Sequence, residues 1–223
     1  DGDKTVNSLN INTSAAFEIA SGTPDPSTIT LRSGGILRSD GNKVNSTISA
    51  NVVLGQDATF QGGNNYDSWL ILSGDIGDGG NGYSVTANRS MIITGTNTFN
   101  GEITINSAHR GFRFHENALG TGTVTINEAA QGFRYVGANG TTTPNDVILN
   151  DTDFRVATGG TDMAGDVTMG DSIQFRHADN MTWSGNWTDN GNGYGLHLGP
   201  SSARTITLSG DLSMDGELFV DNS

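Results

Sequence analysis

The chain has 223 residues, a net charge of −13 and no cysteine, and hydrophobic residues make up only 34% of it. Ordinary soluble domains are ~45–50% apolar, so this chain either is disordered or buries a thin core. The charge disfavours nucleic acid and anionic membranes as partners, because the field of the whole molecule repels them. Without disulfides, stability must come from hydrogen-bonded ladders and packing. No apolar run approaches the ~18–20 residues of a membrane span.

The apolar residues lie in short clusters that predict β-strands. Each cluster is rich in β-branched residues and is bounded by Gly, Asn or Asp, a pattern that disordered acidic chains lack. In chain order the clusters lie at residues 29–31, 52–54, 70–72, 103–105, 124–126 and 147–149. The step from Ile29 to Val52 is as long as the step from Leu37 to Phe60. Helices are not expected, because glycine interrupts every window with a 3.6-residue period.

One fixed period dominates the second half of the chain. It carries Phe112, Phe133, Phe154 and Phe175 at equal intervals, and Leu196 continues the series. The following position in each repeat is occupied by Arg113, Arg134, Arg155 and Arg176, and then by His197. Because side chains alternate between the two faces of a strand, we predict a buried aromatic ladder beneath an external arginine ladder.

Companion strands precede the aromatic ones and vary more in spacing. They start at Ile103, Val124, Val147 and Val167, at intervals that differ by a few positions. Repeats of this length predict an all-β solenoid, a single-stranded parallel β-helix with about 20–23 residues per coil. We expect one domain over residues 1–223, with the clearest repeats at 91–198. An antiparallel β-sandwich also has short strands and frequent turns, but the fixed recurrence of three side chains favours the solenoid.

Residues 91–127 contain two predicted strands and two turn motifs. The first motif consists of Gly95, Asn97, Thr98, Phe99 and Gly101, and the closing motif consists of Ala118, Leu119, Gly120, Gly122, Val124 and Ile126. This arrangement resembles the autotransporter-associated β-strand repeat of bacterial passenger regions. The resemblance implies a right-handed parallel β-helix at the cell surface or outside the cell, within a longer protein that serves as a stalk, an adhesin or a matrix component. The family has no catalytic residue to carry over.

Two groups of side chains are candidate ligand-binding residues. Guanidinium groups pair bidentately with carboxylates, so the arginine ladder at residues 113, 134, 155 and 176 is a candidate strip for an acidic polysaccharide. Its alternative is a solvated ladder whose aliphatic stems cover the sheet. The second group consists of Trp183, Trp187 and Tyr194, which are either a platform for stacking sugars or a plug for a wider coil.

Other polar patterns point to chemistry less directly. Calcium would find oxygen ligands at Asp75, Asp78 and Asn81, or at Asp189, Asn190 and Asn192, although turn chemistry explains these residues equally well. A carboxylate pair for glycoside chemistry would come from Asp151, Asp153, Asp162 and Asp166, but such enzymes need two carboxylates at a set separation in a cleft. Pairs such as Thr123 and Thr125 suggest an ice-binding face, which we do not expect because such pairs do not recur in one register.

We therefore expect a non-catalytic structural or adhesive β-helix module of a bacterial surface or matrix protein, in its most concrete form a filament subunit. The alternative is a carbohydrate-binding module for acidic polysaccharide, and a polysaccharide lyase or hydrolase comes third. The expected partners are further copies of the chain, end to end or side by side, or a surface polysaccharide. We expect no metal, no cofactor, no nucleic acid and no membrane insertion.

Overall fold

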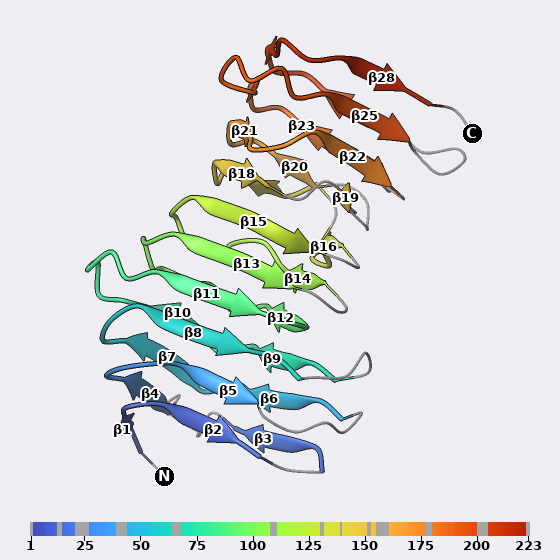
Figure 1. Ribbon diagram of the computed structural model, residues 1–223. Coiled ribbons are helices and arrows are strands. Elements are labelled where there is room, and N and C mark those ends of the chain that lie inside the picture. The colour runs from blue at the N-terminus through green and yellow to red at the C-terminus, as the bar shows by residue number, and fades with distance from the viewer. Residues whose placement is uncertain are drawn as a thin grey trace.

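The computed structural model describes residues 2–12, 15–20, 27–38, 44–63, 68–107, 111–129, 132–138, 140–150, 153–154, 161–176, 180–199 and 205–221, with the backbone alone for residues 37, 38, 129, 153, 154 and 176. The described residues form 28 short strands and no helix, so none of their segments is a helix that could cross a membrane. The pairings between these strands are parallel, and the chain climbs around one axis as a parallel β-helix (Figure 1). The predicted fold class is confirmed.

Each coil runs through three faces, and one face is a single sheet along the whole structure. This long sheet has ten strands. They are β2 (Leu9–Ile11), β5 (Ile36–Arg38), β8 (Ala58–Gln61), β11 (Val85–Asn88), β13 (Ile103–Ser107), β15 (Val124–Ala129), β18 (Val147–Leu149), β21 (Val167–Met169), β24 (Trp187–Thr188) and β27 (Leu212–Ser213). The long sheet therefore runs through both halves of the structure, and the other two faces of each coil flank it.

The face before the long sheet, the entry face, carries two separate sheets. The lower entry sheet consists of β1 (Lys4–Val6), β4 (Thr28–Leu31), β7 (Asn51–Leu54) and β10 (Ile76–Gly77). The upper entry sheet consists of β17 (Thr142–Thr143), β20 (Asp162–Met163), β23 (Met181–Trp183) and β26 (Ile206–Leu208). Between them, side chains add to the backbone hydrogen bonds that join the coils: Oδ1 of Asn97 accepts from the N–H of Ile76 at 2.7 Å, and Nδ2 of Asn145 donates to the carbonyl of Gly122 at 2.8 Å.

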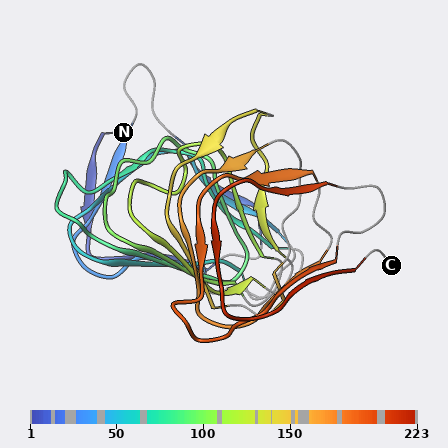
Figure 2. The ribbon, with the colours of Figure 1, turned by 90° about the horizontal axis from the view of Figure 1, so that it is seen from above.

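The face after the long sheet, the exit face, is also divided. The lower exit sheet consists of β3 (Phe17–Ile19), β6 (Ser46–Ile48), β9 (Leu70–Leu72), β12 (Met91–Ile93), β14 (Phe112–Phe114) and β16 (Phe133–Tyr135). The upper exit sheet consists of β19 (Asp153–Phe154), β22 (Ile173–Arg176), β25 (Leu196–Gly199) and β28 (Leu218–Val220). Seen from above, the orange and red upper coils are displaced sideways from the blue and green lower coils (Figure 2). The long sheet is thus the only sheet among the described residues that joins the two halves.

Strand alternation places β-branched and aliphatic side chains inside the long sheet. In register from coil to coil stand Val85, Ile103, Val124, Val147 and Val167, each at most 1% exposed. The predicted alignment of the last four, with its unequal intervals, is confirmed by this register. Over the whole sheet, the number of residues from one strand to its register partner in the next is smallest between β11 and β13. It is half as large again between β8 and β11. Loops absorb the difference while the inward column stays aligned.

The early step of equal length holds for one strand pair and not for the next. Ile29 pairs with Val52, as predicted. Phe60 pairs with Ile36 rather than with Leu37, so the second predicted step was wrong by one residue. Side chains alternate between the faces of a strand, so a shift of one residue decides which side chain enters the core.

The four positions of the predicted aromatic ladder fall in two separate sheets. Phe112 pairs with Phe133, with ring centres 6.1 Å apart and nearly parallel, and Phe114 lies 4.4 Å from Phe133. Phe154 pairs with Phe175 in the upper exit sheet. Since β16 ends one sheet and β19 begins another, the described residues do not form one ladder of four rings. The fixed spacing of the phenylalanines continues across this change of sheet, so the spacing does not reveal it.

The last predicted step of the ladder is two residues short. Phe175 pairs with Leu198 rather than with Leu196, and His197 pairs with Gln174 instead of continuing the arginine series. The physical reason is the turn between β24 and β25, which is three residues longer than the turn between β21 and β22, while the rest of the coil is one residue shorter. The net shift is two residues. A period measured over earlier coils cannot anticipate the length of that turn.

A buried tyrosine closes the lower half at its junction with the upper half. The hydroxyl of Tyr135, at the end of β16, donates to Oε2 of Glu116 at 2.8 Å and lies 2.8 Å from the carbonyl oxygen of Ala138. It also contacts the hydroxyl of Thr141, which leads into β17. The hydrogen bond from Tyr135 holds the pKa of Glu116 below its ordinary value. One side chain thus links the last lower exit strand to the first upper entry strand.

Candidate functional site

Aspartate and asparagine side chains clamp each upper coil to the next at the corner before the long sheet. Oδ1 of Asp146 accepts a hydrogen bond from the backbone N–H of Asp166 at 2.9 Å, and Oδ1 of Asp166 accepts one from Asn186 at 2.8 Å. Asn186 repeats the arrangement with Asp211 at 3.0 Å. Hydrogen bonds to ionised carboxylates are shorter and stronger than neutral ones. Part of the negative charge is therefore structural, and Asp166, considered above for glycoside chemistry, belongs to that part.

The Gly-rich segment after β10 folds around the carboxylate of Asp78, which is 1% exposed. Oδ1 accepts a hydrogen bond from the N–H of Gly80 at 2.9 Å, and Oδ2 accepts three, from the N–H groups of Gly82 at 2.8 Å, Tyr83 at 3.0 Å and Asn100 at 3.4 Å. Burial raises the pKa of Asp78, but the backbone N–H groups directed at it lower it by more, so the pKa lies below its ordinary value. Both carboxylate oxygens already accept hydrogen bonds from the turn.

The segment after β24 uses the same device. Asp189 is 1% exposed, and its carboxylate accepts hydrogen bonds from the N–H groups of Gly191 at 2.9 Å, Tyr194 at 3.0 Å and Asp215 at 3.1 Å. Burial raises the pKa of Asp189, and these backbone donors lower it by more. The two segments support the turn interpretation over the calcium one, because backbone donors occupy the carboxylates. In the described residues, no group of three or more His, Asp or Glu side chains is placed to hold a metal ion.

The arginine ladder is only partly visible. Arg113 and Arg134 are register neighbours on β14 and β16, as predicted. The guanidinium carbon of Arg113 lies 4.4 Å from the centre of the Trp69 ring, a cation–π contact that stabilises this side chain against the sheet. Arg155 lies outside the described residues, and Arg176, described by its backbone alone, belongs to a different sheet. Among the residues whose side chains are described, two neighbouring arginines support the acidic-polysaccharide hypothesis.

The predicted tryptophan platform lies in the core. Trp183 and Trp187 are both 0% exposed, with ring centres 5.2 Å apart, and both pack against Phe175. Neither indole offers a face to a ligand, so their assignment as sugar-stacking residues is wrong. Tyr194 is half-buried and packs against the same core. The second interpretation, a plug that fills a wide coil, agrees with this packing.

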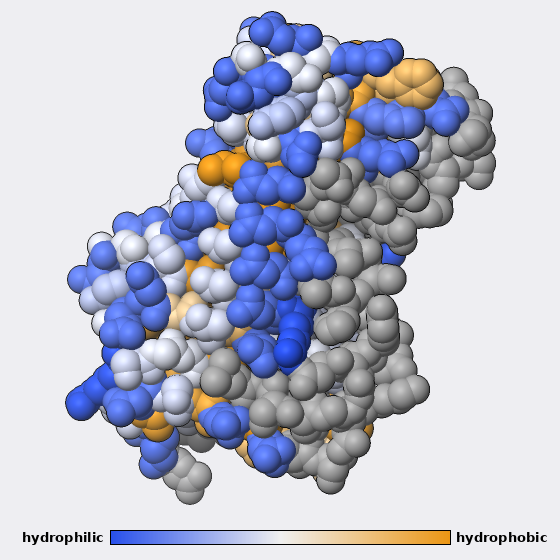
Figure 3. All heavy atoms as spheres, in the orientation of Figure 1, coloured by the Kyte–Doolittle hydropathy of each residue, from blue (hydrophilic) through white to orange (hydrophobic). Residues whose placement is uncertain are grey.

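Polar side chains form columns along the outward face of the long sheet, where hydrophilic residues make a vertical band (Figure 3). One column consists of Thr59, Thr86, Thr104, Thr125, Ile148, Thr168, Thr188 and Ser213. A second column consists of Asn88, Asn106, Asn127 and Asn150, and each amide donates to the asparagine of the preceding coil, at 3.2, 3.1 and 2.8 Å. The result is a regular, uncharged hydrogen-bonding strip.

Sequence reasoning missed the threonine column although its signal was present. The pair Thr123 and Thr125 does not recur, as expected, because Asp146 occupies the position of Thr123 in the next coil. The second member alone recurs, at the outward position of six of the ten strands of the long sheet. Threonine favours solvent-facing strand positions for its β-propensity, so the column has a structural explanation.

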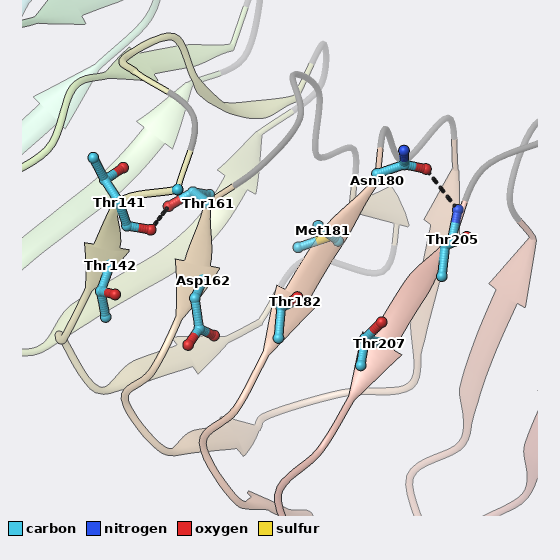
Figure 4. A pocket seen from close by; sticks show the side chains of 10 residues that line it. Thr141, Thr142, Thr161, Asp162, Asn180, Met181, Thr182, Thr205 and Thr207 are labelled. Atoms are coloured by element: carbon cyan, nitrogen blue, oxygen red, sulfur yellow. Dashed lines mark hydrogen bonds between the residues drawn. The ribbon is translucent and has the colours of Figure 1, made fainter.

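A groove of about 420 Å³ lies along the outward face of the upper entry sheet (Figure 4). Its floor is the register column Thr142, Asp162, Thr182 and Thr207, one side chain from each strand. The carboxylate of Asp162 accepts hydrogen bonds from the N–H and the hydroxyl of Ser184 at 3.1 and 2.8 Å. Threonine hydroxyls both donate and accept, so the groove suits a polar, hydroxyl-bearing ligand. Asp162 has a structural partner and is not a free carboxylate.

A second groove, of about 550 Å³, lies on the outward face of the upper exit sheet. Its central column is Gln174, His197 and Phe219, one from each of β22, β25 and β28. The His197 and Phe219 rings meet edge to face with centres 4.5 Å apart. Asp171 and Glu217 line the same groove. None of these residues was singled out as a site from the sequence, because their meeting depends on the two-residue shift of β25.

Comparison with known proteins adds no family. No family model, no curated protein and no solved structure matches this chain. The resemblance of residues 91–127 to the autotransporter-associated repeat therefore stays a prediction.

Proposed function

We propose that this chain is a structural or adhesive module: a rigid β-solenoid presented outside a bacterial cell, within a surface or matrix protein. The chain works by shape and position rather than by catalysis. The proposal draws on the solenoid fold and on the resemblance of residues 91–127 to the autotransporter-associated repeat. It uses no cofactor and no metal.

The long sheet is the observation that carries this proposal. Its strands stay hydrogen-bonded from β2 to β27, although both other faces change sheets half-way. Corner carboxylates and an asparagine ladder add hydrogen bonds between successive coils. Such a body is stiff along its axis and presents one uniform polar strip, which suits a spacer that holds something away from a surface.

Apolar side chains at the last coil support the filament-forming version. Leu212, Leu218 and Val220 point inward by register, yet they are 41%, 46% and 57% exposed. In the first coil, Phe17 is 39% exposed. Stacking the first coil of a second copy onto the last coil would bury these side chains and pair two open strand edges.

Sedimentation velocity tests this assembly. We expect the purified chain to form larger species as its concentration rises, and the double variant Leu218→Asp plus Val220→Asp to stay monomeric. Val53→Asp is the matched control, because Val53 is 38% exposed on β7, away from both ends. A chain that stays monomeric at every concentration contradicts end-to-end stacking.

Antibody labelling tests the location. Antibodies against the purified chain should label intact, unpermeabilised cells of the source bacterium or the material around them. Labelling that requires permeabilisation would place the chain inside the cell and rule the proposal out.

A carbohydrate-binding module is the second candidate. The two grooves on the upper coils favour it, because hydroxyl, amide and carboxylate groups converge in both. The arginine pair is the weaker support, since one of its two guanidinium groups already stacks on an indole.

A further inference from the structure

Phe219 lies on the outward face of β28, opposite to the face that contributes to the core. It is 47% exposed. The exposure of Leu218 and Val220 reflects their position in the last coil, but Phe219 points outward, in register with the outward residues His197 and Gln174. On the solvent side of the strand, the ring of Phe219 keeps an accessible apolar face.

The neighbours of Phe219 provide flat and hydrogen-bonding groups. The imidazole of His197 packs against its ring at 4.5 Å and 87°, which restricts the ring. Gln174 lies one coil below His197 and two coils below Phe219, and its amide both donates and accepts hydrogen bonds. Oγ of Ser172 accepts a hydrogen bond from the N–H of Gly195 at 3.1 Å, so its own O–H can donate outward. An aromatic face surrounded by such groups is suited to a sugar ring, which has apolar C–H faces and polar edges.

The charge of the groove decides the kind of sugar. Among the described residues that line it, the ionisable groups besides His197 are the carboxylates of Asp171 and Glu217, with no Lys or Arg. Asp171 also accepts a hydrogen bond from the N–H of Ser172 at 2.7 Å. Carboxylates accept hydrogen bonds from sugar hydroxyls but repel uronate or sulfate groups, and the net charge of −13 acts in the same direction.

We propose that this groove binds a neutral glycan, with one sugar ring stacked on Phe219 and its hydroxyls hydrogen-bonded to Gln174, Asp171 and Glu217. The ligand class differs from the acidic polysaccharide expected for the arginine ladder. The site rests on the proposed function for its biological role, because it gives the adhesive module something to adhere to.

Native gel electrophoresis through embedded polysaccharide tests the site. The probes are hydroxyethyl cellulose, arabinoxylan, glucomannan and dextran as neutral polymers, and polygalacturonate as the acidic one. We expect retardation in at least one neutral gel and none in polygalacturonate. Phe219→Leu keeps an apolar side chain without a ring and should weaken the apparent affinity about tenfold, whereas Phe219→Trp should retain it.

Two controls separate this site from the others. Thr182→Val removes a hydroxyl from the groove of Figure 4 without changing side-chain shape, and should leave retardation unchanged. The double variant Arg113→Ala plus Arg134→Ala should also leave it unchanged. The proposal is overturned if no neutral gel retards the chain, if Phe219→Leu behaves as the unaltered chain does, or if only polygalacturonate retards it. The labelling and sedimentation experiments do not involve this groove, so they judge the adhesive module independently.

Discussion

Glycine and a carboxylate or amide residue stand side by side at the corner before the long sheet, as in Gly165–Asp166 and Gly185–Asn186. The two residues solve one problem together. A Cβ atom on Gly185 would lie 1.9 Å from the carbonyl oxygen of Gly165, so only glycine lets successive coils approach to strand-pairing distance. The neighbouring side chain then holds that distance with a hydrogen bond between coils. Composition that first suggests disorder is therefore the composition of tightly stacked corners.

Replacing Gly185 with alanine should destabilise the fold by at least about 2 kcal/mol, because the new methyl group would displace the backbone of the coil below. Gly199→Ala is the matched control: its Cβ would meet the nearest atom, the carbonyl oxygen of Phe175, at 3.5 Å, an ordinary contact. Urea unfolding followed by circular dichroism measures both. Equal stability of the two variants would show that the corner tolerates a side chain.

The buried turn carboxylate of Asp78 predicts a dependence of stability on pH. Its folded pKa lies below its unfolded value, so its contribution is complete above about pH 4 and is lost as the pH falls through the folded pKa. Asp78→Asn should lower the melting temperature at pH 7, because an amide accepts on one atom only. The variant should also lose less stability than the unaltered chain between pH 5 and pH 2, about the range in which carboxylates titrate. Parallel melting curves against pH would contradict this role.

Single strands of two to six residues cannot persist alone, so each element of this molecule depends on its partners above and below. The break between β16 and β19 is therefore the weakest place on the exit face. Tyr135 bridges the change of sheets through its hydroxyl, which joins Glu116 to the residues that lead into β17. At this scale a side chain does the work that backbone pairing does elsewhere.

Tyr135→Phe tests the junction. Removing the hydroxyl leaves the groups around it without their shared partner and should cost about 1–3 kcal/mol of unfolding free energy. Tyr83→Phe is the control, a half-buried tyrosine whose expected change is within about 0.5 kcal/mol. Thermal unfolding compares the two, and an unchanged Tyr135→Phe variant would mean that the halves are held together by the long sheet alone.

The sequence predicted the strands better than the sites. Ile103, Val124 and Val147 could be aligned from the sequence because loops vary while the inward column does not. Leu196 could not be placed, because the length of the turn around the buried Asp189 shifts the register by two residues. Trp187 also shows the limit, since aromatic residues in a Gly-rich segment look exposed until the width of the coil is known.

The groove at Phe219 depends on the same shift and could not have been read from spacing. In a solenoid the outward columns are set by the register between coils. A register error of one residue moves a side chain to the other face of its strand, and an error of two residues moves it to another column. Inward positions can be predicted from the sequence pattern alone, because many different apolar residues can fill them. Binding surfaces cannot, because they need particular side chains on adjacent strands.

The whole molecule has contacts almost only between neighbouring coils, so its stability is distributed rather than concentrated in one core. Interior coils have two neighbours, and terminal ones have one. The inward side chains of β13 and β15 that are described are 0% exposed, whereas those of β27 and β28 are 41–57% exposed. Order should therefore decrease from the middle to the ends.

Hydrogen–deuterium exchange should show this gradient. Amides in β13 and β15 should exchange slowest, and those in β27 and β28 fastest, by several orders of magnitude, because end coils open locally. Mass spectrometry of proteolytic peptides resolves the difference. Uniform exchange along the chain would instead indicate a single all-or-none unit.

The hydrogen bonds of the long sheet run parallel to the axis and the strands run across it, and this orientation matters under load. A pull applied between the two ends would act on one coil boundary at a time, as a zip opens, and not on all boundaries together as in shear. Each coil that comes free releases its own length of chain, roughly 70 Å for about 20 residues. A stalk built this way would keep its length up to the force that opens one coil boundary, and above that force it would lengthen in steps.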